Sequence, residues 1–381
     1  MSEGKNFVEN MAGLAPSEKE TEFSRREFLK TAGTGLFAAL AAGNAKEALA
    51  LVEKAGGAGK EHKAGEPKVS FDIFYSAHET REDAKGLAER FRKADIYVPE
   101  ANGWTEMWRR DMNAVSQGTL TPELFFRKRG VDPKNVLFSF DFAEIEMLYG
   151  SKKPVVFVDL PESHPLYRRT QETKQEINRF NLTKGFPEML KKFTSDLKRF
   201  ADVQVERERY MLQELKRLTE RIQKGEAPEF KGKKDAKLLL FLGAAHTKIY
   251  HELKKSGAEA GRGFVTMPYV FGEFASEMFR RQMFGKPVND ELAARAVGGL
   301  FFRAVVINYA GYLRQDSHKL ALLERKVVSR FSFNDIKSVF DRAQKSADTM
   351  GALALGFSEK FDEKKIKIPA DEKELDEFLQ K

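Results

Sequence analysis

The chain has 381 residues, of which 41% are hydrophobic and 32% charged, a balance typical of a globular protein with a sizeable core. Its formal net charge is +8, but 65 basic residues are interleaved with 57 acidic ones, so no basic stripe indicates nucleic-acid binding. The chain has no cysteine, which excludes disulfides, thiolate nucleophiles and Cys-ligated metal sites. Any metal must be bound by His, Asp or Glu side chains.

The first 50 residues carry an export pattern. The stretch "SRREFLK" is followed by a run of small, weakly apolar residues and an Ala-x-Ala site at 48–50. It resembles a twin-arginine signal peptide, matched by Ser24, Arg25, Arg26, Phe28, Leu29 and Lys30. The resemblance implies the twin-arginine translocation machinery as a partner and a periplasmic or other extracytoplasmic location, with a membrane anchor if the signal is not cleaved. The alternative interpretation is an amphipathic surface helix.

Residues 51–68 are rich in glycine and poor in apolar residues, which predicts a flexible linker before an α/β core at 69–271. Apolar runs predict strands at 69–78, 95–100, 154–159 and 237–243, and 261–270 predicts a fifth. Helical spacing follows the first two strands. We therefore expect a mostly parallel central sheet of four to five strands flanked by helices.

Two regions lack strand signals. Residues 170–225 predict a helical insertion, broken around Gly185 and Pro187, and residues 272–381 predict a helical C-terminal region packed on the core. The apolar segment 296–313 is nearly long enough to cross a bilayer, but Arg303 near its centre and Asn308 make insertion costly. We expect a core helix there, and no transmembrane helix in the mature chain.

Polar side chains end four of the expected strands. His78, Glu100 and Asp159 each close a strand, and His246 follows the run "KLLLFLGAA". The carboxyl ends of parallel strands meet at one edge of a sheet, where open α/β folds bind ligands. Two imidazoles and one or two carboxylates can bind Mn, Co, Zn or Fe, so the strand ends predict a divalent metal site formed by His78 and His246 with Glu100 or Asp159. The alternative is a hydrogen-bonded polar cluster without metal.

These segments resemble the Tiki and TraB (pheromone shutdown) family, in a superfamily that includes erythromycin esterases and haem-binding ChaN proteins. The carriers are "GAAH" at 243–246, the unit from "FYSAHE" to "VPEANG", "VVFVDLPESHPLYRRT", and "VERERYM" before the second histidine. The resemblance covers about residues 70–260. It places His78, Glu100 and His246 at the family's positions, Asp159 with Arg168 or Arg169 at the third strand, and Glu206 and Arg207 in the site. The chain departs from the family at Tyr75, where the family has glycine.

The resemblance implies a metal-dependent hydrolase that acts on a peptide or another small acyl substrate. In it Glu100 is a third ligand or a general base, Arg207 stabilises a developing oxyanion and Glu206 orients Arg207. Activities differ within the superfamily, so the alternative is a non-catalytic periplasmic protein that uses the same edge to bind a peptide, haem or metal.

Overall fold

The computed structural model describes residues 67–76, 81–132, 139–177, 184–227, 235–264, 273–309 and 317–380. The export pattern, nearly all of the expected linker and His78 lie outside these ranges. The chain divides into two compact units. One holds the described residues within 41–172 and 200–269, and the other holds those within 173–199 and 270–381. The expected helical insertion is therefore shared between the two units.

The first unit is built on a parallel sheet, as the sequence predicts. Its strands are β1 (Lys68–Ser76), β2 (Ile96–Pro99), β3 (Asp235–Gly243) and β4 (Glu259–Phe264), in the order β2-β3-β1-β4. All three pairings are parallel. The fold class is therefore α/β with four strands, and β4 is the fifth strand expected from the sequence.

The expected third strand, 154–159, is not part of the sheet. Only Val155 forms a bridge, with Tyr97 at the edge of β2. The bridge is made by the carbonyl of Pro154 and the N–H of Val156, which bond Tyr97 at 3.0 and 2.9 Å. On the outer edge, the side-chain amide of Asn113 bonds both the N–H and the carbonyl of Val155, at 3.1 and 3.0 Å, so no further strand pairs with Val155 there. Pro154 next to it has no N–H to donate. The segment therefore continues as irregular chain that carries Asp159 to the site.

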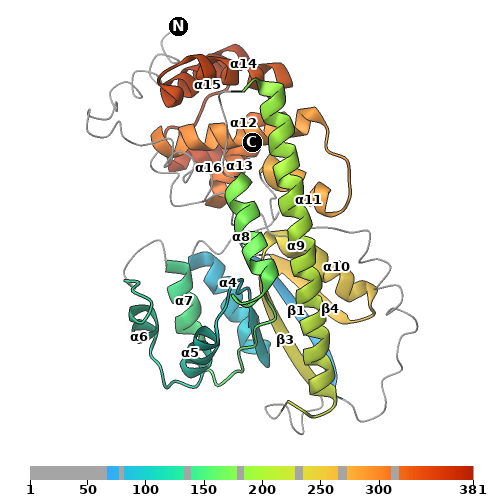
Figure 1. Cartoon of the computed structure of the whole chain (residues 1–381). Helices are drawn as coiled ribbons and strands as arrows, with labels where there is room; N and C mark the ends of the chain where they lie inside the picture. The colour runs from blue at the N-terminus through green and yellow to red at the C-terminus, as the bar shows by residue number, and fades with distance from the viewer. Residues whose placement is uncertain are drawn as a thin grey trace. The chain divides into compact units, whose positions relative to one another are not determined.

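Helices cover both faces of the sheet (Figure 1). Alternate residues of β3 explain the apolar run: Leu238, Leu240 and Leu242 pack on one face, and Leu239 and Phe241 on the other. The first face packs against α10 (Thr247–Lys255) and the later turns of α9 (Phe186–Gln223). The second packs against α4 (Arg81–Lys93), α5 (Glu106–Ser116), α6 (Pro122–Arg127) and α7 (Ser139–Leu148). Helix α8 (Pro165–Ile177) begins in this unit, and its residues from Thr173 onward are assigned to the other unit.

The second unit is helical. Its described residues include the end of α8, the first turns of α9, which begins at Phe186 beside the predicted break, and six further helices. These are α11 (Phe274–Met283), α12 (Asp290–Tyr309), α13 (Ser317–Val328), α14 (Phe333–Lys345), α15 (Thr349–Lys364) and α16 (Glu372–Gln380). The expectation of a helical C-terminal region is confirmed.

Helix α12 lies at the centre of this unit and contacts α11, α13, α14 and α15. Its two adjacent glycines permit these close approaches: a Cβ at Gly298 would lie 3.0 Å from Ile336, and one at Gly299 would lie 2.2 Å from Glu324 Oε1. Arg303 of the same helix is buried and pairs with Glu273 and Glu324. None of the described helices is both long and apolar enough to span a membrane.

Candidate functional site at the carboxyl edge of the sheet

The site lies at a topological switch point, where the connections that follow two neighbouring strands leave on opposite faces of the sheet. β1 is followed by α4 on one face, whereas β3 is followed by α10 on the other, and the two strands are neighbours. Such a switch point opens a crevice at the carboxyl ends of the strands. Glu100 follows β2 and His246 follows β3, so both lie at this edge.

His246 lies between two glutamates. Its Nδ1 is 3.2 Å from Glu208 Oε1 of α9, and its Nε2 is 3.1 Å from Glu100 Oε1. The side chain of His246 is fully buried, that of Glu208 is 2% exposed and that of Glu100 is 20% exposed. Glu100 is therefore the member of this trio that solvent reaches.

Arg207 connects the trio to Asp159. Its Nε donates to Asp159 Oδ1 at 2.8 Å, and its Nη2 donates both to Asp159 Oδ2 and to Glu100 Oε1, the latter at 2.9 Å. Its Nη1 donates to Gln204 Oε1 at 3.2 Å. The guanidinium group is 2% exposed, so Arg207 is a buried brace between carboxylates.

Backbone groups fix the same side chains. The N–H of Gly243 donates to Glu100 Oε2 at 2.6 Å, and the N–H of Ala101 donates to Asp159 Oδ2 at 3.1 Å. Tyr75 of β1 is buried, and its hydroxyl donates to the carbonyl of His246 at 3.1 Å. The short 3-10 turn that carries His246 is thus held from β1.

The carboxylates determine the electrostatics of the site. Burial alone would lower the pKa of His246, but Glu100 and Glu208 outweigh it and raise the pKa to about 9. Burial raises the pKa of Glu208, with the hydrogen bond to His246 opposing the shift. Burial would likewise lower the pKa of Arg207, but Asp159 and Glu100 raise it. With its pKa near 9, His246 is protonated at neutral pH, so His246 and Arg207 supply two positive charges beside the three carboxyl groups of Glu100, Asp159 and Glu208.

Three buried polar atoms near the site have no hydrogen-bond partner among the described residues. They are Glu208 Oε2, Asn102 Oδ1 and Thr247 Oγ1. Glu208 contacts His246, Thr247 is its neighbour in the chain, and Asn102 is two residues from Glu100. Since buried polar groups are nearly always paired, each of these atoms can take a hydrogen bond from or to a water molecule or a ligand.

The structure brings together four of the residues predicted from the sequence, Glu100, Asp159, Arg207 and His246. It does not place Glu206 with them: Glu206 is 37% exposed and pairs with Arg169 at 2.8 Å. Asp159 and Gln204 orient Arg207 instead. His78 lies outside the described residues. Among those residues, no group of three or more His, Asp or Glu side chains is arranged to hold a metal ion.

The sequence reasoning missed Glu208, although the pattern of α9 contains a signal for it. The buried apolar residues Met211, Leu215, Leu218 and Ile222 follow helical spacing. Continued backwards by three or four residues, this stripe reaches Glu208 and Arg207 but not Glu206. The face of the helix, rather than the motif alone, selects the site residue.

Comparisons with known proteins give no match: no protein-family model fits the chain, and neither curated proteins nor solved structures include a similar one.

Proposed function

We propose that the chain is a hydrolase that acts on a peptide or another small acyl substrate at the carboxyl edge of its sheet. The observation that supports this most is the buried His246 between Glu208 and Glu100, with only Glu100 open to solvent. An imidazole oriented by one carboxylate and placed against a second, accessible one suits acid–base chemistry or metal binding.

The proposal includes a divalent metal, Mn, Co, Zn or Fe, with His78, Glu100 and His246 as ligands. Two histidines and a glutamate are residue types that such an ion takes as ligands. Ligand atoms about 2.1 Å from a tetrahedral ion lie roughly 3.4 Å apart, and Nε2 of His246 is 3.1 Å from Oε1 of Glu100. Glu208 would accept the Nδ1 hydrogen and leave Nε2 as the ligand atom. β1 ends at Ser76, paired with Gly243, two residues before His78 in the sequence.

Each residue has a defined task in this proposal. When bound, the ion would lower the pKa of a water molecule and polarise the acyl carbonyl. Glu100 either binds the ion or takes the proton of the attacking water, which then passes to the leaving group as the acyl bond breaks. Arg207 holds Glu100 in place through its hydrogen bond, and Asp159 fixes Arg207. Glu208 orients His246.

Metal analysis of the full chain, combined with a screen of peptide and ester substrates, tests the proposal. Replacing His78 or His246 with alanine should lower the metal content sharply and abolish hydrolysis. His251→Ala is the control, because His251 is exposed on α10 five residues beyond His246. Circular dichroism checks that each variant folds.

Three outcomes decide between the alternatives. Hydrolysis without metal that still needs His246 would contradict the metal and leave an acid–base hydrolase. Bound metal, haem or peptide without turnover would indicate a binding protein. Unchanged metal and activity in both histidine variants would contradict the site itself.

We also propose that residues 1–50 direct twin-arginine export. The double change Arg25→Lys and Arg26→Lys keeps the charge but removes the guanidinium pair, so the protein should accumulate inside the cell. Fractionation of cells that express either form measures this. Delivery of the double variant at the normal level would contradict the proposal.

A further inference from the structure

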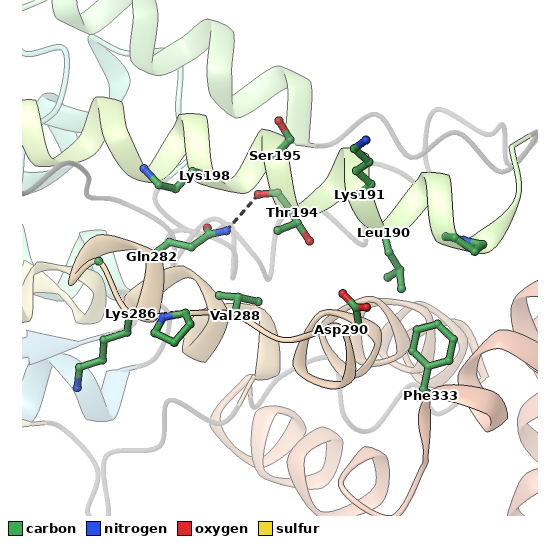
Figure 2. A pocket seen from close by; sticks show the side chains of 13 residues that line it. Leu190, Lys191, Thr194, Ser195, Lys198, Gln282, Lys286, Val288, Asp290 and Phe333 are labelled. Atoms are coloured by element: carbon green, nitrogen blue, oxygen red, sulfur yellow. Dashed lines mark hydrogen bonds between the residues drawn. The ribbon is translucent and has the colours of Figure 1, made fainter.

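The helical unit contains a second concave site. A cavity of about 810 Å³ lies between the first turns of α9 and the connection from α11 to α12, with Phe333 at the start of α14 also in its wall (Figure 2). All its lining residues belong to this one unit. Its volume lies in the range of pockets that bind small molecules.

Local sequence patterns form both walls. From α9 come Pro187, Leu190, Lys191, Thr194, Ser195 and Lys198, whose spacing of three and four residues places them on one helix face. The opposite wall follows a helix ending of the Schellman type. Gly285, with φ of 64°, donates to the carbonyl of Gln282 at 3.1 Å, and Lys286 donates to that of Arg281 at 2.7 Å. This turn brings Lys286 and Val288 to the cavity.

Gln282 carries an unsatisfied acceptor in this wall. Its Nε2 donates to the carbonyl of Thr194 at 3.1 Å, but its Oε1 has no partner among the described residues. The residue is only 7% exposed. Since a buried carbonyl without a partner costs free energy, the cavity favours a ligand that brings an N–H or O–H donor.

The charges and apolar groups of the cavity define the rest of the ligand. Lys191, Lys198 and Lys286 line it with Asp290 as the one lining carboxylate, which gives three positive charges against one negative. Leu190 and Phe333 supply apolar surface, and Figure 2 separates them along the cavity from Lys198, Gln282 and Lys286. In the same view Lys191 and Asp290 lie on the side of Leu190 and Phe333. The cavity therefore has a cationic, hydrogen-bonding end and a second end that combines apolar surface with one lysine and one carboxylate.

We propose that this cavity binds the carboxyl-terminal end of a peptide whose last side chain is apolar. The terminal carboxylate pairs with the lysine ammonium groups, a backbone N–H donates to Gln282 Oε1, and the apolar side chain lies against Leu190 and Phe333. A peptide end supplies all three features: a carboxylate, a backbone N–H and an apolar side chain. This site is separate from the residues at the sheet edge and does not depend on hydrolysis.

Calorimetric titration of the full chain with N-acetyl-Ala-Phe tests this inference. The free acid should bind, and the corresponding amide, which lacks the carboxylate, should bind about tenfold more weakly. Lys286→Gln should weaken binding of the acid about three- to tenfold. Gln282→Met keeps the side-chain length, removes the acceptor and should also weaken binding.

Two controls make the result specific. Lys345 is an exposed lysine of the same unit that does not line the cavity, so Lys345→Gln should leave binding unchanged. Glu100→Gln alters the sheet edge and should leave it unchanged too. The inference is overturned if the probe does not bind, if acid and amide bind equally, if Lys286→Gln binds like the original chain, or if Glu100→Gln abolishes binding.

Discussion

The buried ion cluster of α12 should make the helical unit less stable as the pH rises. Arg303 Nη2 contacts Glu273 and Glu324, with the Glu324 oxygen at 3.0 Å, and Glu324 is 2% exposed. Burial raises the pKa of Glu324 from 4.5 to about 7, with Arg303 opposing the shift and Glu273 adding to it. Two carboxylates on one guanidinium leave an excess negative charge, which a proton on Glu324 removes.

The sign and size of the effect follow from linkage. The folded chain holds the Glu324 proton at pH values where the unfolded chain has lost it. The stability that this proton contributes is therefore fully present below pH 4.5 and is lost as the pH rises towards 7. Integrating this one titration between pH 5 and 7.5 gives a loss of about 2 kcal/mol in the free energy of unfolding. Glu324→Gln keeps the shape without a titrating group and should lack this loss.

Urea unfolding followed by circular dichroism at 222 nm measures the difference. Both tryptophans, Trp104 and Trp108, lie in the other unit, so their fluorescence does not report on α12. Glu277→Gln is the control. Burial would raise the pKa of Glu277, but Arg325 and Arg281 outweigh it and lower the pKa, so this variant should differ from the original chain by the same amount at both pH values. An equal pH dependence in the original chain and in Glu324→Gln would refute the reasoning.

Three further outcomes are expected. Asp335→Ala removes the capping box of α14 and should cost about 1–2 kcal/mol at neutral pH. Burial would raise the pKa of Asp335, but the box and nearby lysines outweigh it and lower this pKa to about 2. The cost of the change, measured by urea unfolding, should therefore shrink as the pH falls through that value. Gly299→Ala places a Cβ 2.2 Å from a buried carboxylate and should lower the melting temperature markedly, whereas Gly261→Ala, with no atom within 4 Å, should not. Glu208→Gln should weaken metal binding about 10- to 100-fold, because it removes the carboxylate that orients His246. Glu206→Gln changes an exposed ion pair and should leave metal binding unaltered. Equal effects of the two changes would argue against an orienting role for Glu208.

The sequence predicts the strands of the sheet well where a long apolar run is buried on both faces. It predicts them poorly where an apolar segment pairs with the sheet through one residue only. The segments that form β1, β2 and β3 are apolar because helices cover both faces of the sheet. Residues 154–159 are equally apolar, yet only Val155 bridges to β2, and the amide of Asn113 occupies the outer edge of Val155. An amide 42 residues away cannot be read from a strand pattern.

The glycines of α12 show a similar division. Their pairing in an apolar helix indicates close packing of some neighbour, and the contacts with Ile336 and Glu324 agree with that prediction. The identity of the neighbour was not predictable from α12, because a carboxylate against a helix backbone arises only once Arg303 is buried beside it. Arg303, whose charge argues against a membrane span, is therefore also the residue that pairs with the buried glutamates around α12.

The surroundings of His246 depend on the register of the strands. Tyr75, Glu100 and Glu208 contact it from 171, 146 and 38 residues away, so no local window contains its partners. In the parallel pairing, Tyr75 lies opposite Leu242, and a slip by one residue would turn its hydroxyl to the other face. The run from Leu238 to Leu242 is apolar at every position and so does not specify that register by alternation. The sequence therefore predicts that Glu100 and His246 meet at one edge of the sheet, whereas the hydrogen bonds that set the protonation of His246 follow from tertiary packing.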